Sequence, residues 1–260
     1  MRTVAELKLG EHVCCLYESE DEHRRVLSAF LTQGLCQRGR FVYVTDGHPP
    51  ETILKYLTGA GQDPEPDLAS GQLRFLRKED AYLRLGLFDP DKMIRMLGDE
   101  TARAVADGYA GLWVTGEMTW ALSGAPGSAR LIEYEARLNR FFPGSRCVGV
   151  CQYDRGRFPA STLLNVLRTH PLAVVGTELF SNFYYVPVDE LMSLRYAEAA
   201  LDNWLRHLTH LHPPEEPNGA SHHDAGDDDE LAEREAEILS LKREDNTLLR
   251  SQGRAPKFYI

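Results

Sequence analysis

The chain contains 260 residues, of which 43% are hydrophobic, so it can bury the core of one domain of about 200 residues with additional segments. Its formal charge of -10 at pH 7 argues against binding to DNA or to an anionic membrane, because such binding requires clustered Lys and Arg. Apolar runs fall far short of the roughly 20 residues that span a bilayer, and residues 1–10 contain no signal-peptide core. We therefore expect a cytoplasmic protein.

Short runs of β-branched or aromatic residues alternate with longer amphipathic stretches from residue 12 to about residue 187. This alternation predicts βαβ units and a three-layer α/β fold with a mainly parallel sheet. In chain order, strands are predicted at 12–17, 41–45, 73–76, 112–115, 147–152 and 172–175, with an antiparallel edge strand at 183–186. Helices are predicted at 21–36, 51–58, 89–108, 128–142, 159–168 and 188–208.

The composition changes at the end of the predicted domain, which covers residues 1–211. Residues 212–229 are rich in Pro, Gly and acidic side chains and have too few apolar groups to offset the entropy of ordering, which predicts a disordered linker. In residues 230–252, Leu and Ile recur at a and d positions, so this helix could form a coiled-coil homodimer. The alternative is a solvated, partly helical tail. Residues 253–260 are expected to be flexible.

The cysteines indicate neither a disulfide framework nor a zinc ribbon, because their number is odd and no two have CxxC spacing. We expect buried, reduced thiols. The five cysteines are Cys14, Cys15, Cys36, Cys147 and Cys151. Cys14 and Cys15 are adjacent on the first predicted strand, so they should point to opposite faces of the sheet.

The turn after the first predicted strand is informative, because ligands of parallel α/β sheets bind beyond the carboxyl ends of the strands. A phosphate-binding loop would have the pattern GxxxxGK[ST] at this point. Residues 18–22 read ESEDE, with no glycine and no lysine, and their acids would repel a triphosphate. The standard mode of nucleotide binding is therefore excluded, and we expect a sensor and not an ATPase.

Polar side chains lie near the ends of several other predicted strands, and we expect them to line one ligand-binding cleft. The candidate residues are His12, Tyr17, Glu117, Trp120, Glu135, Cys151, Tyr153, Asp154 and His170. Each has an ordinary alternative. Glu117 could be an exposed loop acid paired with a neighbouring arginine, and Asp154 could form a salt bridge with Arg155 or Arg157. Trp120 could be a packing residue.

Several candidates are of the right type to bind a transition metal, namely His12, Glu117, Cys151, Asp154 and His170. No HxH, HxxxH or CxxC spacing connects any two of them, so the sequence predicts no metal and no cofactor. Cys151 and His170 could also form a nucleophilic pair. Cys151 follows the apolar run VGV, however, which favours burial as a small hydrophobic residue.

Six segments, in order along residues 8–188, resemble the methanogen/methylotroph sensory domain, MEDS, which is named after a dichloromethane-responsive repressor. They are EHVCCLY (11–17), FLTQGL (30–35), GEMTW (116–120), IEYEARLN (132–139), CQYDR (151–155) and RTHP (168–171). The resemblance implies a RecA-like or KaiC-like fold whose phosphate-binding loop has been lost. It also adds Tyr134 to the candidate ligand-binding residues and places the other candidates, apart from Trp120, at positions typical of the family.

The resemblance implies a non-enzymatic sensory module that responds to a small, hydrocarbon-like molecule. Members of the family are attached to transcriptional regulators, sensor kinases or ATPase domains, whereas this chain shows no such domain. We therefore expect a module that binds a small ligand and regulates a protein partner in transcriptional control. Two other hypotheses remain. The chain could be an enzyme that uses Cys151, His170, Asp154 or Glu117, or a scaffold that acts through residues 230–252.

Overall fold

The computed structural model describes residues 2–193 together with Leu201 and Leu205. The predicted domain boundary at residue 211 lies outside the described residues. So do the linker at 212–229, the heptad segment at 230–252 and the tail at 253–260. Most of 194–208, the second half of the last predicted helix, lies outside them as well.

One seven-stranded sheet forms the centre of the domain, with the strand order β3-β2-β4-β5-β1-β6-β7. The first six strands run parallel, and β7 is antiparallel to β6. The bounds are β1 His12–Tyr17, β2 Arg40–Thr45, β3 Leu73–Arg77, β4 Leu112–Glu117, β5 Cys147–Asp154, β6 Leu172–Val175 and β7 Glu178–Ser181. The predicted α/β class with a mainly parallel sheet is confirmed.

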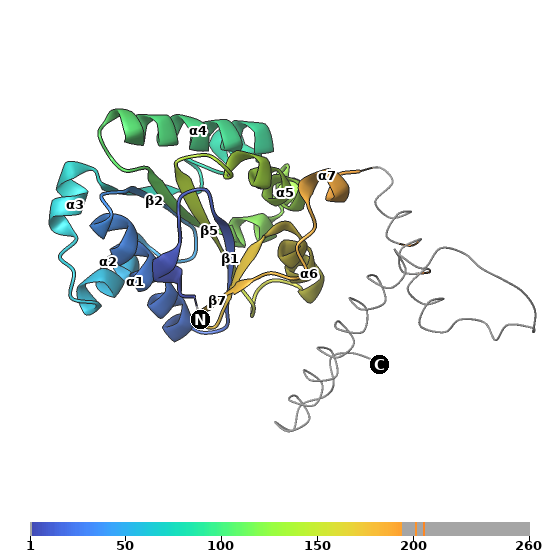
Figure 1. The fold of residues 1–260 in the computed structure, drawn as a ribbon, viewed down its shortest axis with the longest axis horizontal. Helices are drawn as coiled ribbons and strands as arrows, with labels where there is room; N and C mark the ends of the chain where they lie inside the picture. Colours follow the sequence, from blue (N-terminus) through green and yellow to red (C-terminus); the bar gives the residue numbers. More distant parts are fainter. Residues whose placement is uncertain (1, 194–200, 202–204, 206–260) are drawn as a thin grey trace, which may run out of the picture. The chain divides into compact units, whose positions relative to one another are not determined.

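Helices cover both faces of this sheet and make three layers (Figure 1). One face, called the α1 face below, is covered by α1 Glu20–Cys36, α2 Pro50–Gly59 and α3 Glu65–Ser70. The opposite face, called the α5 face, is covered by α4 Pro90–Ala106, α5 Leu131–Phe141 and α6 Ala160–Thr169. The short α7, Val188–Leu191, contacts α5.

Each face has its own hydrophobic core because successive side chains of a strand point to opposite sides of the sheet. Cys14 and Leu16 of β1 belong to the core of the α5 face, whereas Val13 and Cys15 belong to that of the α1 face. Both adjacent cysteines are fully buried. The expectation that they point to opposite faces is therefore confirmed.

The edge strand was placed wrongly by the sequence pattern. The antiparallel strand is β7, which pairs Ser181 with Leu172, and not the aromatic run at 183–186. Gly176 has a positive φ of 64°, so the chain turns back directly after β6 and reaches its pairing position earlier than predicted. Phe183 is then 80% exposed in a turn, beyond the end of the ladder.

Several predicted boundaries also shift. Strands β4 and β5 are longer than predicted, so Glu117 and Tyr153 are the last and the next-to-last residues of strands and do not lie in turns. Sequence reasoning missed α3 and the 3-10 helix Met118–Ser123 that follows β4. It located α4 well, because Asp89 accepts hydrogen bonds from the amides of the first turn.

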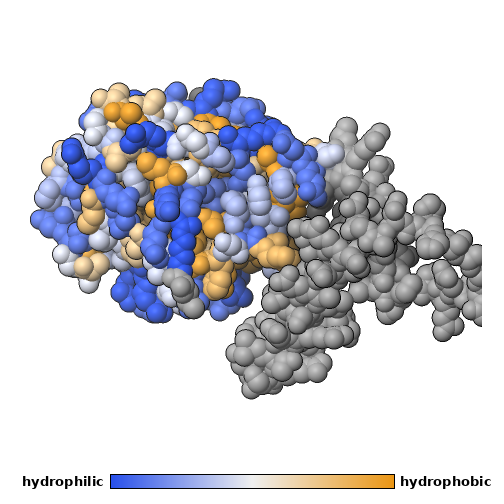
Figure 2. Space-filling view, viewed as in Figure 1, coloured by the Kyte–Doolittle hydropathy of each residue, from blue (hydrophilic) through white to orange (hydrophobic). Residues whose placement is uncertain are grey.

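The surface carries polar and apolar side chains in small, interspersed patches on the face that Figure 2 shows. Among the described residues, no helix combines the length and the apolar character needed to cross a bilayer.

Packing of helices against the sheet predicts that alanine will affect stability differently at two helical glycines, Gly34 of α1 and Gly59 of α2. The Gly34→Ala substitution should lower the free energy of unfolding by about 1–3 kcal/mol, because its Cβ would lie 2.8 Å from Cγ of Trp113. The matched Gly59→Ala change meets no atom within 4 Å and should be neutral or stabilising by up to about 1 kcal/mol. Urea denaturation measures both. Equal midpoints for the two variants would contradict the packing described here.

Candidate functional site

The turn between β1 and α1 is closed by its own side chains. Ser19 caps α1 by accepting a hydrogen bond from the amide of Glu22 at 3.3 Å. The carboxylate of Glu22 accepts one from the amide of Glu18 at 2.8 Å. Two backbone amides that could bind an external anion are thus occupied by side chains of the turn itself, one of them by a carboxylate.

The predicted candidates do not line one cleft, which corrects the expectation from the sequence. His12, Glu135, Cys151, Tyr153 and His170 meet on the α5 face, inside the domain. Tyr17 and Glu117 belong to the α1 face, because they alternate with residues that point the other way.

The hollow at the carboxyl ends of β1 and β5 is a separate feature. It has a volume of about 490 Å³ and is lined by Glu18, Arg155, Gly156, Phe158, Ala160 and Leu163. None of these belongs to the predicted site.

Four buried donor groups form what we call the His-Cys-Glu cluster: His12, Glu135, Cys151 and His170. Oε2 of Glu135 lies 3.2 Å from Nε2 of His12 and 3.3 Å from Nε2 of His170. Sγ of Cys151 lies 3.4 Å from the same oxygen and 3.6 Å from Nε2 of His12. Each of the four residues is at most 8% exposed.

The sheet order brings these groups together from four separate segments. Strand β1 begins with His12 and lies between β5, which carries Cys151, and β6, which follows His170. Cys151 pairs in register with Cys14, two residues beyond His12 and on the same face. Helix α5 lies across these strands and contributes Glu135.

Hydrogen bonds fix the tautomer of both imidazoles. The side-chain amide of Asn139 donates to three backbone carbonyls, those of Glu135, Ala136 and Thr169, so its oxygen is left to accept from Nδ1 of His12 at 3.0 Å. Nδ1 of His170 lies 2.8 Å from the carbonyl oxygen of Val166, which can only accept. Both rings therefore carry a proton on Nδ1 and turn Nε2 towards Glu135.

The groups of the cluster influence one another's pKa strongly, because they are close together and buried from water. Burial alone would raise the pKa of Glu135, but the two imidazoles outweigh it and hold that pKa well below its usual range. Burial lowers the pKa of His12 and raises that of the Cys151 thiol. Tyr153 donates a 2.6 Å hydrogen bond to Oε1 of Glu135, the oxygen that faces away from the imidazoles.

A small internal cavity of about 20 Å³ lies against Cys151. Its lining is almost entirely apolar and comprises Tyr82, Met93, Leu97, Val114, Thr115, Gly116, Tyr134, Leu138, Phe142, Gly149, Val150 and Cys151. A side chain at Gly149 would overlap the Phe142 ring, so glycine is required for this packing.

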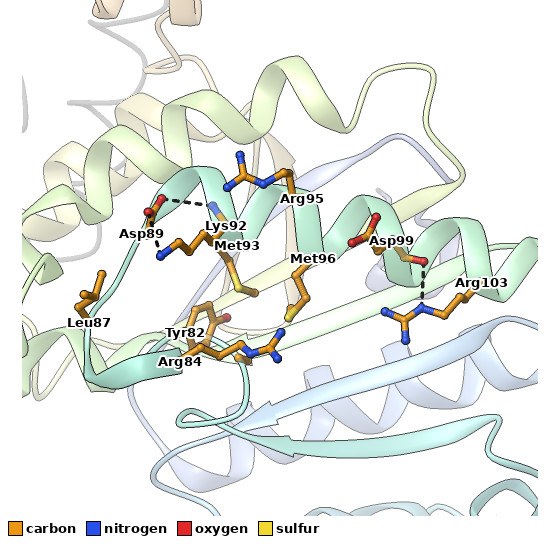
Figure 3. A pocket seen from close by; sticks show the side chains of 11 residues that line it. Tyr82, Arg84, Leu87, Asp89, Lys92, Met93, Arg95, Met96, Asp99 and Arg103 are labelled. Carbon is orange, nitrogen blue, oxygen red and sulfur yellow. Dashed lines mark hydrogen bonds and ion pairs between the residues drawn. The ribbon is translucent and has the colours of Figure 1, made fainter.

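A larger pocket opens on the surface beside α4 and has a volume of about 370 Å³ (Figure 3). In Figure 3, Met93 and Met96 project from α4 towards Tyr82 and Arg84 on the segment before it. Tyr82 and Met93 line both this pocket and the internal cavity. The two spaces therefore share these two side chains.

The α1 face contains a different polar network around Glu117, which is 2% exposed and not an exposed loop acid. Its carboxylate accepts hydrogen bonds from the amides of Gly47 and His48 in the β2–α2 loop and from the hydroxyl of Tyr43. Nδ1 of His48 lies 3.2 Å from Glu117, and its Nε2 lies 3.0 Å from Glu20. The carboxylate of Glu117 is the main reason that the pKa of His48 rises to about 9.

The remaining candidates have packing or local roles. Trp120 stacks on Tyr82 with ring centroids 5.0 Å apart, and Tyr134 packs edge-on against Phe88. Tyr17 contacts the ring of His23.

Asp154 accepts a hydrogen bond from the amide of Gly156. The salt bridge predicted for Asp154 is not formed, because Arg155 pairs instead with Glu18 at 2.6 Å.

Sequence reasoning overlooked Asn139, Tyr82, Met93 and His48. Asn139 could have been found, since it lies four residues after Glu135 and therefore on the same side of α5. The other three come from segments with no chemical motif, and only the folded chain brings them to the site.

Comparison with known proteins identifies related sequences. The profile described as MEDS, the MEthanogen/methylotroph, DcmR Sensory domain, matches residues 11–171. The transcriptional repressor DcmR of Methylorubrum extorquens (strain DSM 6343 / CIP 106787 / DM4) is 27% identical over 165 residues, which are 62% of this chain and 58% of that repressor. The chain thus spans less than two thirds of the length of this curated relative.

Two solved structures are similar at low identity. The KaiC-like protein PH0186 of Pyrococcus horikoshii OT3 has 12% identity and a TM-score of 0.46, covering 64% of this chain and 70% of that one. The flagellar accessory protein FlaH of Methanocaldococcus jannaschii has 14% identity and a TM-score of 0.48, covering 66% and 76%. The fold assignment rests on the sheet order given above.

The burial of the cysteines predicts their reactivity. All five lie in the described part of the chain, and Cys36 is the exposed one. Ellman's reagent should therefore react rapidly with one thiol in the native protein, and Cys36→Ser should remove this rapid phase. A rapid phase that persists in the variant would mean that at least one of the four buried thiols is accessible.

The position of His48 predicts a dependence of stability on pH. Its pKa is about 9 in the folded chain against an ordinary value of 6.5, so its stabilising effect is complete below about pH 6.5 and is lost as the pH rises through 9. At pH 6, His48→Gln should lower the free energy of unfolding by about 1–3 kcal/mol. The difference from the native chain should shrink towards pH 10, as measured by urea denaturation. A constant difference would exclude the proposed titration.

Proposed function

This chain belongs to the MEDS family, and on that premise we propose that it is a sensory domain that binds a small apolar molecule on its α5 face and regulates a partner in transcriptional control. The observation that carries the proposal is the series of spaces from the surface pocket, past Tyr82 and Met93, to the internal cavity beside Cys151. A surface opening, movable side chains and a mainly apolar space behind them are the parts that a sensor of small molecules requires.

The internal cavity selects its ligand by size and polarity. Its volume of about 20 Å³ corresponds to roughly one water molecule, and its apolar lining offers water few partners. A molecule with a few heavy atoms enters only if Met93 and Leu97 of α4 move. Met93 suits this role, because an unbranched thioether side chain changes its rotamer readily.

Helix α5 provides a route from the cavity to the end of the described domain. Tyr134 and Leu138 line the cavity, and Arg140 on the same helix pairs with Asp189 of α7. A ligand that binds two positions of α5 with different affinity would shift the population of docked α7. This supports regulation through a protein partner. Dimerisation through residues 230–252 remains a prediction.

The buried state of Cys151 favours sensing over catalysis. The nucleophile of a cysteine enzyme is the thiolate, and burial raises the pKa of this thiol. Cys151 also contacts Glu135, whose negative charge opposes a second negative charge. The alternative enzyme with a Cys/His/carboxylate site would need an open cleft, whereas this cluster is enclosed. A role in transcriptional control agrees with a cytoplasmic location.

Apolar probes test the proposal directly. Xenon and dichloromethane should raise the melting temperature of the full chain, and Val114→Ile, which extends a side chain into the cavity, should weaken the effect at least about tenfold in concentration. Val44→Ile is the matched control, since Val44 is buried in the same core but does not line the cavity.

Two results would contradict the proposal. One is an equal response of the Val114→Ile and Val44→Ile variants, which would place the probes elsewhere. The other is stabilisation by ATP with Mg²⁺ and not by the apolar probes, which would indicate a nucleotide-binding domain of an unusual kind.

A further inference from the structure

The His-Cys-Glu cluster has the composition and the geometry of a metal centre. We propose that it binds one transition-metal ion in tetrahedral coordination, and that Zn²⁺ fits its nitrogen, sulfur and oxygen donors best. This inference goes beyond the sensory role, since metal binding by the cluster requires no apolar ligand.

Four of the six separations between donor atoms match those around a tetrahedral ion. Zn²⁺ bonds of about 2.0–2.1 Å to N or O and about 2.3 Å to S separate two N or O ligands by about 3.3 Å and a sulfur from either by about 3.5 Å. Oε2 of Glu135 lies 3.2 and 3.3 Å from the two imidazole nitrogens. Sγ of Cys151 lies 3.4 Å from that oxygen and 3.6 Å from His12. All four donor atoms lie within 4.8 Å of one another.

The groups behind the donors are arranged as in metal sites. A histidine that binds a metal through Nε2 normally donates its Nδ1 proton to a fixed acceptor, which sets the tautomer and the ring orientation. Asn139 accepts this proton from His12, and the carbonyl of Val166 accepts it from His170. Tyr153 holds the other oxygen of Glu135, which leaves Oε2 as a single donor.

Hydrogen bonds within the protein do not satisfy every buried polar atom of the cluster. Nε2 of His170 is buried and has no hydrogen-bond partner, and its nearest charged atom is Oε2 of Glu135 at 3.3 Å. The Nδ1 hydrogen bonds leave two states for each Nε2: a second proton, which puts an imidazolium charge in the interior, or a lone pair that faces the carboxylate. Two lone pairs that face one carboxylate oxygen repel it, unless a cation lies between them.

Charge balance supports a divalent ion. Among the described residues, no Lys or Arg pairs with Glu135, and its ion pairs are with His12 and His170 alone. A divalent cation with one carboxylate, one thiolate and two neutral imidazoles forms a neutral unit. Such a unit avoids the cost of a buried net charge.

The reason for predicting no metal from the sequence no longer applies. That expectation rested on the lack of short spacings between donors, but here they come from β1, α5, β5 and the residue that follows α6. Cys14 lies nearby on β1 and is not a fifth donor, since its thiol faces the carbonyl of Leu172.

Metal binding is tested on the full chain, stripped with a chelator and titrated with Zn²⁺ or Co²⁺. One equivalent of Co²⁺ should give the intense ligand-field bands of a tetrahedral site and a thiolate-to-cobalt charge-transfer band. Cys151→Ala should abolish the charge-transfer band, whereas Cys147→Ala should retain it. Cys147 is the matched control, because it is buried on the same strand and face but lies outside the cluster.

Two further variants sharpen the result. Asn139→Ala should weaken metal affinity about 10–100-fold without removing a donor, because it releases the Nδ1 proton of His12. A chain with His222→Ala and His223→Ala should bind as the native chain does, which excludes the adjacent histidines of the linker segment as the site.

The inference is overturned if the folded, metal-free chain binds no equivalent of Zn²⁺ or Co²⁺. It is also overturned if the cobalt complex lacks a thiolate band, or if Cys147→Ala and Cys151→Ala lose it equally. Circular dichroism confirms that each variant is folded. A failed apolar-probe experiment leaves these readouts unaffected, so the two proposals are separately testable.

Discussion

A single buried carboxylate, that of Glu135, constrains this domain more than any other group. An ionised acid in the interior is tolerated only beside positive charge and hydrogen-bond donors, because its transfer from water is costly. Tyr153 on β5 donates a hydrogen bond, and the imidazoles of His12 at the start of β1 and of His170 after α6 either carry the positive charge or hold the cation that supplies it. The requirement of one charge therefore fixes α5 against three segments that are far apart in the sequence.

The alternation of strand side chains assigns different chemistry to the two faces of the sheet. On β5, Cys151 belongs to the His-Cys-Glu cluster, whereas the next residue, Gln152, hydrogen-bonds His23 and Tyr43 on the α1 face. In the turn where a phosphate loop would lie, Glu22 accepts a hydrogen bond from the amide of Glu18, and in the neighbouring β2–α2 loop Glu117 accepts one from the amide of His48. The space that could admit a ligand is on the opposite face, beneath α4.

The sequence could predict the architecture and could not predict the site. Alternating apolar runs fix the strands, since burial on both faces requires them, and they located six of the seven strands closely. The prediction of the edge strand failed because an aromatic run has the composition of a strand even where no neighbouring strand is left to pair with it. Positions near predicted strand ends identified His12, Glu135, Cys151 and His170 as candidates, and the resemblance to MEDS places them at positions typical of the family. Their contacts could not be inferred, because no local spacing records which segments the sheet order makes neighbours.

The contact between α5 and α7 depends in part on charges that are exposed to water. It includes the ion pair of Arg140 with Asp189, whose side chains are 58% and 84% exposed. Exposed pairs of this kind contribute at most about 1 kcal/mol, which is close to the thermal energy at room temperature. This pair therefore adds little to the free energy that holds α7 against α5, and what it adds is screened by salt. Ionic strength alone should thus shift the balance between the docked and released positions of α7.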